Sequence, residues 1–580
     1  MPGITPSTLM RLEEPEKKRV KDILAYIEND DLGIPEFQRE FEWRRSNVTD
    51  LLVSMLRGYY IGSLLFWSID RTTDMAFGPI YGTRLPTNPR YLILDGQQRV
   101  SALYYVIKAP NIPLWGMKKP IRFFIDIKEM LKLDGKAKVE DEKLVVSYTD
   151  DEITRKNLND KQNQFATRTF PLKELETVSR WCYDFEAFLK TVEHSTPENA
   201  NKLSDSVSKH LEFLLKDFEI PIIKLPSEIS IGNVAKIFEK LNTMGLDLTT
   251  FDLLNARMIK HNIKPRELWK TSARNNALIK EFSEGNDRFP LYIVQTLALK
   301  RGKPVKSDEL LDLSSRKFET DWTAAVGDTE SMLKMLKETR SVNDGFGVLT
   351  RNLVPFRQSL PILAALFSKA KGRARAEMNK KIIKWYWSAI ITHAYAGSTD
   401  TQTYIDYNAV NRWFTDNSSL PQVVIEAKAN LANPNVITLE QLVTGSDALY
   451  KGILCLIALK GGRDFVQNTI TTFNTIDAHH IFPESRAREF GASDDQINSI
   501  LNMTLLDADT NRNYIRAKKP SQYINEIMRE FGLTERQMRD RLETHLISSS
   551  AFDALLNDDF TTFITERKRT VIAAFLSILT

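Results

Sequence analysis

The stretch "LILDGQQRVSAL" at residues 92–103 predicts how the first part of the chain folds. Its apolar run stops at Asp95, Gly96 allows a tight turn, and the polar residues 97–99 open a segment whose apolar positions recur at helical spacing. Strand, turn and helix in direct succession indicate an α/β or α+β domain. The free amides at such a helix start, next to an arginine, also suit an anion.

A second polar motif, "GIPEFQREFEW" at residues 33–43, lies upstream. Pro35 gives it an extended start and its aromatic residues can pack, yet Gln38 and Arg39 interrupt the apolar pattern. The two motifs could line one polar pocket. They could equally form a buried polar network that only holds the strand-to-helix turns. The residues alone leave both interpretations open.

Hydrophobic periodicity extends this reading along the chain. Short apolar runs bounded by Gly, Pro and charged residues predict further strands, at 61–69, 121–127 and 220–226. Helical spacing predicts helices at 47–58 and 97–109. The charged stretch at 132–163 has the composition of a solvated insertion.

The length of 580 residues exceeds what one hydrophobic core normally serves, so we expect several domains. Residues 1–260 form the expected α/β domain. Helical periodicity dominates residues 261–450, and short mixed elements return within residues 451–580. The sequence therefore predicts a multidomain α+β protein with a helical middle.

Composition restricts the class of protein. The 79 basic and 75 acidic residues nearly cancel, so any nucleic-acid surface must come from local clustering of charge. Cys182 and Cys455 both lie in apolar surroundings and cannot make a disulfide framework. No apolar run approaches the ~18 residues of a membrane span, and the start lacks a signal-peptide pattern. We expect a cytoplasmic protein without a membrane partner.

Near the C-terminal end, "TIDAHHIFPES" at residues 475–485 places His479 beside His480, in a chain with 7 histidines. The segment "NMTLLDADTNRNYIRAKKP" follows at residues 502–520. Imidazole and amide groups suit a divalent metal with open positions, and a second histidine can deprotonate water. The alternative is a packed histidine pair that caps a strand beside Pro483.

These two segments together resemble the ββα-metal motif of the HNH endonucleases, in the branch fused to GmrSD-type restriction proteins. The resemblance implies that His479 is a metal ligand, in a position where aspartate is common, and that His480 is the general base. It implies that Asn502 orients the base and holds the hairpin, and that Asn511 is the second ligand. Asn513 is a possible substitute for Asn511.

Three further features accompany this resemblance. Asp477 is a candidate for supporting the metal ligands. Lys518 and Lys519 lie just beyond the motif, where they can contact DNA phosphates. The implied cofactor is one divalent metal, Mg²⁺ or Mn²⁺.

The two N-terminal motifs, with "IFEKLNTMGLDLTTFDLL" at 237–254, resemble the ParB/sulfiredoxin-like domain of the GmrSD family. That domain is associated with nucleotide binding and with sensing modified DNA. Asn242 and Gly245 belong to the third motif. The sequence has no G-x-x-x-x-G-K-[ST] motif, so an NTP, either GTP or ATP, would need another pocket. The resemblance implies that this pocket is lined by Gln38, Arg39, Asp95, Gly96, Gln97, Gln98 and Arg99.

The order of a sensor domain followed by a nuclease resembles single-chain type IV restriction and SspE-like phage-defence proteins. We therefore expect an HNH endonuclease that recognises modified phage DNA and is regulated by NTP binding or hydrolysis. One alternative is a DNA-stimulated NTPase with a degenerate nuclease site. Another is a non-catalytic DNA-binding module of a defence complex. A homodimer is possible, because a single HNH centre cuts one strand.

Overall fold

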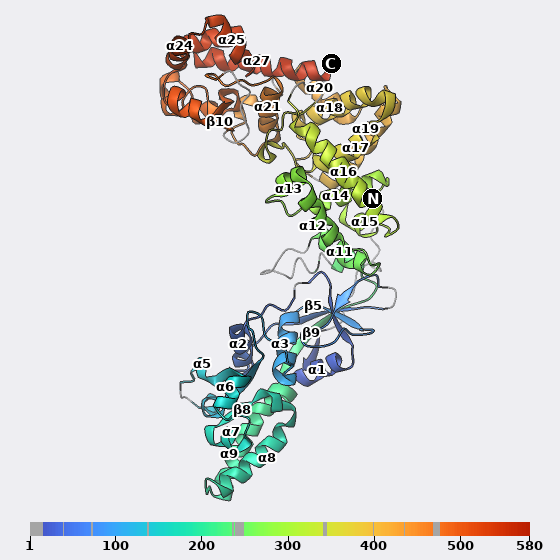
Figure 1. The fold of residues 1–580 in the computed structure, drawn as a ribbon, viewed down its shortest axis with the longest axis vertical. Coiled ribbons are helices and arrows are strands. Elements are labelled where there is room, and N and C mark those ends of the chain that lie inside the picture. Colours follow the sequence, from blue (N-terminus) through green and yellow to red (C-terminus); the bar gives the residue numbers. More distant parts are fainter. Residues whose placement is uncertain are drawn as a thin grey trace. The chain divides into compact units, whose positions relative to one another are not determined.

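The computed structural model describes residues 15–580, apart from 39, 71–72, 136–137, 235–236, 238–248, 340–344, 398, 434–435 and 468–475. The chain divides into two compact units, residues 1–264 and 265–580 (Figure 1). The expected boundary near residue 450 falls inside the second unit. Both units combine helices with small sheets, in agreement with a multidomain α+β fold.

The first unit is built on a six-stranded sheet with the order β1-β9-β3-β5-β2-β4. Its strands are β1 (Glu16–Arg19), β2 (Leu32–Pro35), β3 (Leu64–Ser68), β4 (Phe77–Gly78), β5 (Tyr91–Asp95) and β9 (Glu219–Leu225). The pairs β9–β3 and β5–β2 are parallel, and the other neighbours are antiparallel. The predicted strands at 61–69 and 220–226 are confirmed as β3 and β9, and the predicted strand that ends at Asp95 is confirmed as β5.

Helices cover this sheet and extend the unit beyond it. These helices include α1 (Val20–Glu28), α2 (Arg45–Leu56), α3 (Gln97–Lys108) and α11 (Thr250–Ile259). The others are α4 (Ile127–Leu131), α5 (Asp141–Leu144), α6 (Asp150–Arg155), α7 (Lys161–Thr167), α8 (Val178–Thr191) and α9 (Pro197–Glu212). Helices α8 and α9 run side by side (Figure 1). The predicted helices at 47–58 and 97–109 are confirmed as α2 and α3.

The expectation of a solvated insertion at 132–163 is wrong. Val145–Thr149 form strand β7, which pairs with β6 (Ile121–Asp126), and β8 (Thr169–Pro171) completes a three-stranded sheet. The side chains of Val145 and Ser147 are buried. Alternate burial over five residues is enough to form a strand, although charged residues on both sides dominate the composition.

The second unit begins with a layer of helices and ends with a hairpin surrounded by helices. The first group is α12 (Pro265–Asn275), α13 (Ala277–Ser283), α14 (Phe289–Lys300), α15 (Ser307–Leu311), α16 (Phe318–Lys337), α17 (Ser359–Lys369), α18 (Arg375–Ile391), α19 (Thr399–Thr415), α20 (Gln422–Ala432) and α21 (Ala448–Leu459). The later elements are β10 (Ile476–His480), α22 (Asp494–Asn498), β11 (Met503–Asp507), α23 (Ala508–Thr510), α24 (Pro520–Glu530), α25 (Glu535–Glu543), α26 (Ser549–Leu556) and α27 (Phe560–Leu579).

The C-terminal helix α27 connects the two parts of the second unit. It contacts α18 and α20 of the helical layer, and it also packs on α26. The rings of Phe560 and Phe563 at its start contact Phe482, which follows β10. The hairpin is thus anchored in a core to which the last helix contributes. Within the part of the chain described, no helix is both long and apolar enough to cross a bilayer.

Candidate active site

The two neighbouring histidines lie at the end of β10, in an antiparallel hairpin with β11. In the strand register His479 pairs with Thr504 and His480 pairs with Met503. Phe482, two residues further on, is fully buried and anchors the end of the strand in the core. Helix α23 and a helical turn at Asn511–Ile515 follow β11. The order of the main elements is therefore β10, α22, β11 and α23.

The turn after β11 brings Asn511 back against the first histidine. Nδ2 of Asn511 lies 2.8 Å from Nδ1 of His479, although the residues are 32 positions apart. An amide can be turned by 180°, which exchanges its nitrogen for its oxygen. The pair then offers one imidazole nitrogen and one amide oxygen, a donor set that suits Mg²⁺ or Mn²⁺. Asn513 is exposed, whereas Asn511 contacts His479. The structure therefore favours Asn511 over Asn513 as the partner of His479.

The donor set is small. Among the described residues, no group of three or more His, Cys, Asp or Glu side chains could hold a metal ion. The side chain of Asp477 lies outside the described residues, so its supporting role stays a prediction. A cation at His479 and Asn511 would take its other ligands from water or from phosphate oxygens. The residues present thus fit a divalent metal with an open coordination shell.

The second histidine contacts an amide that sequence reasoning missed. Nε2 of His480 lies 2.9 Å from Oδ1 of Asn498, at the end of α22. Nδ2 of Asn498 donates to the carbonyl of Asp494 and, at 3.4 Å, to the carboxylate of Glu484. "DDQIN" at 494–498 reads as an ordinary short helix, so the sequence contained no signal for this contact.

Asn502 holds the hairpin from a fully buried position. Its Oδ1 accepts the N–H of Phe482 at 2.8 Å, and its Nδ2 donates to the carbonyls of Phe482 and Ile497 at 2.9 and 2.8 Å. These contacts tie the end of β10 to the loop before β11. The amide that contacts His480 belongs to Asn498.

Two buried polar side chains, Arg567 and His545, support the hairpin from outside it. Arg567 of α27 donates to the carbonyls of Leu501 and Met503, and burial lowers the pKa of its guanidinium to about 9. His545 accepts at Nδ1 from the hydroxyl of Thr504, and burial lowers its pKa to about 4. Each pairing joins residues more than 40 positions apart, so no local pattern could have predicted it.

The carboxylate of Asp464, which the sequence analysis did not single out, connects the loop before the hairpin to the residues after β11. Oδ1 of Asp464 accepts from the hydroxyl of Thr510 at 2.7 Å, and Oδ2 accepts from the backbone N–H of Asp507 at 3.2 Å. Asp464 is 1% exposed. It therefore holds the start of the segment that carries Asn511.

The two lysines beyond the hairpin are engaged with carboxylates at the surface. Lys518 pairs with Glu526, and Nζ of Lys519 lies 3.2 Å from Glu489. The hydrogen bond from Lys519 lowers the pKa of the Glu489 carboxyl. Surface pairs of this kind contribute little stability, so a phosphate can replace the carboxylate as the partner.

The N-terminal motifs come together around the start of α3. Nη1 and Nη2 of Arg99 donate to the carbonyls of Ile61 and Ser63 at 2.6 and 2.9 Å, and Nη2 also contacts Asp95 at 2.9 Å. Gly96 has φ of +91°, and a Cβ there would lie 2.2 Å from Cδ2 of Leu64. The turn thus requires glycine.

The glutamines of these motifs also bond to the backbone. Gln38 donates to the carbonyls of Ile93 and Leu94. Gln98 donates to the carbonyl of Glu40 and accepts from the N–H of Glu42, each at 3.0 Å. These contacts favour the interpretation as a polar network that holds the turns.

The remaining residues of the N-terminal motifs differ in burial or lie outside the described residues. Gln97 is buried, and the carboxylate of Asp95 is 55% exposed. Arg39, Asn242 and Gly245 lie outside the described residues. Nucleotide binding at these motifs stays a prediction.

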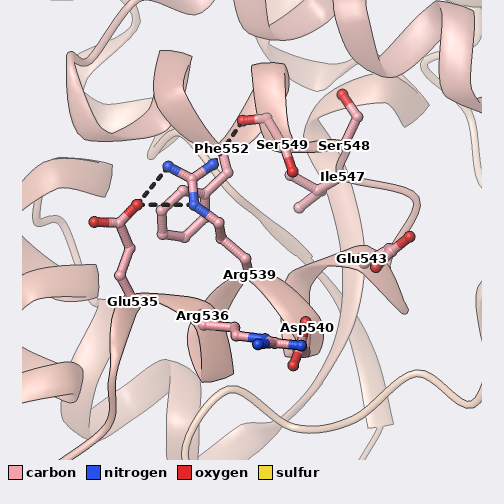
Figure 2. Close-up of a pocket in the computed structure, with 9 residues that line it drawn as sticks. All are labelled: Glu535, Arg536, Arg539, Asp540, Glu543, Ile547, Ser548, Ser549 and Phe552. Carbon is pink, nitrogen blue, oxygen red and sulfur yellow. Dashed lines mark hydrogen bonds and ion pairs between the residues drawn. The ribbon is translucent and has the colours of Figure 1, made fainter.

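A cavity of about 320 Å³ lies between α25 and α26 (Figure 2). Its lining combines three carboxylates with two guanidinium groups, so its charge does not suit a polyanion. Arg539 crosses it, bonds to Glu535 and the carbonyl of Ser549, and lies over the ring of Phe552. The arginine is thus held by the protein itself.

Comparison with known proteins bears chiefly on the first unit. Residues 20–259 match the family model for the N-terminal domain of the GmrSD restriction endonuclease. An uncharacterized protein of Methanocaldococcus jannaschii is 28% identical over 602 residues, with 97% of this chain and 99% of that protein covered. The first unit thus resembles the N-terminal domain of the GmrSD restriction endonuclease. The second alignment extends through both units.

Proposed function

We propose that this chain is a metal-dependent DNA endonuclease of a restriction or phage-defence system, with an HNH centre in the second unit. The observation that carries the proposal is the contact of His479 with Asn511, directly beside His480, at the end of a two-stranded hairpin. The GmrSD-type match of the first unit is an independent reason to expect DNA as the substrate.

Each side chain of the centre has a distinct task in phosphodiester hydrolysis. His479 and Asn511 would hold a divalent cation, which supplies stabilisation of the negative charge that develops on the scissile phosphate. His480 takes a proton from the attacking water. The hydrogen bonds of Asn502 to Phe482 and Ile497 hold the end of β10 against the loop before β11. Lys518 and Lys519 exchange their carboxylate partners for phosphates of the bound strand.

We assign the sensing of modified DNA to the loop that Arg99 holds in the first unit. Tyr59 and Tyr60, directly before this loop, are 57% and 75% exposed. Exposed aromatic rings stack on bases that have left the duplex, at about 1–3 kcal/mol per base. Arg99 fixes the carbonyls of Ile61 and Ser63, so it also fixes where the two tyrosines emerge. Regulation by GTP or ATP at the same motifs would act on this loop.

The test is a nicking assay with Mg²⁺ or Mn²⁺ on supercoiled plasmid and on modified phage DNA, with and without GTP or ATP. We expect nicked circles from the wild-type chain and none from His480→Ala. His194→Asn is the matched control, because it removes an exposed histidine of the first unit. Tyr60→Ala should reduce the preference for modified DNA while nicking of a permissive substrate continues.

Three outcomes would contradict the proposal. No nicking of any DNA by the wild-type chain, with DNA-stimulated NTP hydrolysis present, would favour an NTPase with a degenerate nuclease site. Nicking that is unchanged in His480→Ala would show that the hairpin is not the catalytic centre. DNA binding without either activity would indicate a non-catalytic module.

A further inference from the structure

Asn498 connects the second histidine of the hairpin to two hydrogen-bond acceptors. Its Oδ1 lies 2.9 Å from Nε2 of His480, while its Nδ2 lies 3.0 Å from the carbonyl oxygen of Asp494 and 3.4 Å from Oε1 of Glu484. Asn498 is half-buried and ends α22, and Glu484 lies four residues after the end of β10. The amide therefore lies between the base and two groups on neighbouring elements.

The chemistry of these partners determines which way the amide points. A carbonyl oxygen and a carboxylate can only accept hydrogen bonds, so the NH₂ group must face Asp494 and Glu484. The amide oxygen then faces His480, and an oxygen can only accept. Nε2 of His480 must consequently carry the hydrogen. In the neutral ring this leaves the lone pair on Nδ1, where a water can lose its proton.

The position of Asn498 is itself fixed by residues around it. Asn502 donates to the carbonyl of Ile497, the residue next to Asn498, and the Ile497 side chain is fully buried. On the other side, Ser499 donates to the carbonyl of Leu439 at 3.0 Å. Asn502 thus acts on His480 through the backbone next to Asn498.

We propose that Asn498 is the positioning residue of the general base, and that Glu484 orients the amide of Asn498. This inference rests on the proposed nuclease function. Asn498 holds the His480 ring in one rotation and one tautomer, with Nδ1 presented to water. Glu484 prevents the amide from turning, because an inverted amide would place its NH₂ group against the donor of His480.

Variants at position 498 separate positioning from a structural role. Asn498→Asp keeps an oxygen for His480 but loses the donor to Asp494, whereas Asn498→Leu loses both. We expect Asn498→Leu to lower kcat by about 10- to 100-fold, as for other groups that support a catalytic ligand. DNA affinity, measured with Ca²⁺ in place of Mg²⁺, should stay within about twofold. Asn498→Asp, combined with Glu484→Gln to avoid two adjacent carboxylates, should recover most of kcat.

Asn525→Leu is the matched control. Asn525 also donates from a helix to the carbonyl four residues earlier, Ser521, but it is exposed and lies on α24. Its substitution should leave kcat unchanged. If Asn498→Leu keeps the wild-type kcat, or if Asn498→Asp with Glu484→Gln is as impaired as Asn498→Leu, Asn498 is only a helix-end residue and the inference fails.

The tautomer has a signature that does not depend on cleavage. Ring ¹⁵N NMR of histidine-labelled, deuterated, metal-free protein at pH 8 distinguishes a proton on Nε2 from one on Nδ1. The His480 signal is assigned by its loss in His480→Gln. We expect the Nε2–H form in the wild type and a mixture in Asn498→Leu. An Nδ1–H form in the wild type would overturn the inference even if the chain cleaves DNA, and the Nε2–H form would support the geometry even if it does not.

Discussion

Nη1 of Arg567 donates a 2.8 Å hydrogen bond to the carbonyl oxygen of Leu501, which lies 66 residues earlier in the chain. The last helix thereby holds the backbone just before β11. The same guanidinium donates to Met503 and His545, and the whole residue is inaccessible to solvent.

Arg567→Met should destabilise the second unit strongly. It leaves three buried carbonyl oxygens without their donors, each at a cost of about 1–3 kcal/mol. We expect the free energy of unfolding to fall by at least about 3 kcal/mol, measured by urea denaturation. Arg569→Met is the control on the same helix, because Arg569 is exposed and forms a surface ion pair with Glu566. If the free energy of unfolding falls by less than about 0.5 kcal/mol in both variants, the hydrogen bonds of Arg567 do not stabilise the second unit as we expect.

His545 should make the stability of the protein depend on pH. Burial lowers its pKa from the ordinary 6.5 to about 4, so the unfolded chain binds the extra proton between these values. The stabilisation is therefore complete above pH 6.5 and is lost as the pH falls toward 4. From pH 7 to pH 5 we expect a loss of about 2 kcal/mol in the wild type that His545→Gln does not show. Equal losses in the two proteins would refute this assignment.

Gly96→Ala should disrupt the turn that opens α3. The residue has φ of +91°, and the added methyl would lie 2.2 Å from Cδ2 of Leu64. Strain and overlap together should cost about 2–4 kcal/mol of unfolding free energy. Gly58→Ala is the matched control, because Gly58 also has positive φ, +66°, but nothing lies within 4 Å of its Cβ position. It should cost only about 1 kcal/mol.

The proposed metal ligands, His479 and Asn511, can be tested without DNA. Asn511→Leu and His479→Leu should each weaken Mn²⁺ binding at least tenfold in calorimetry, because each removes one of two protein ligands. Asn511→Asp should strengthen binding, since a carboxylate compensates the charge of the cation. The exposed Asn513 supplies the control, and Asn513→Leu should bind Mn²⁺ as the wild type does. If Asn513→Leu is the variant that loses Mn²⁺, the second ligand is Asn513.

The lysines after the hairpin should contribute to DNA binding through phosphate charge. Replacing both Lys518 and Lys519 by Ala should make the slope of log K against log [salt] less steep by up to about 2, because each phosphate contact contributes about 0.9. DNA binding is measured in the His480→Ala background, in which we expect no cleavage. Lys270→Ala is the control, since Lys270 is exposed and forms a similar surface pair with Glu267. An unchanged slope would exclude these lysines from the DNA contact.

Local patterns in the sequence were sufficient for the elements that carry both sites. The apolar run before Asp95 and the left-handed glycine after it predicted β5, its turn and α3, because each depends on neighbouring residues. The contact of His479 with Asn511 also agrees with the expected pairing, since the antiparallel pairing of β10 with β11 and the helical turn after β11 bring the two residues together. The strand β7 was missed because charged residues around it outweighed its short alternation of burial.

Tertiary structure alone decided which polar groups meet. Asn498 and Asn502 are four residues apart and look alike in the sequence, yet one contacts His480 and the other is buried against the backbone of Phe482. The sequence likewise did not predict that Arg99 bonds to the carbonyls of Ile61 and Ser63. A side chain's partner depends on how separate elements pack, and a pattern of residue types contains no information about that packing over tens of residues.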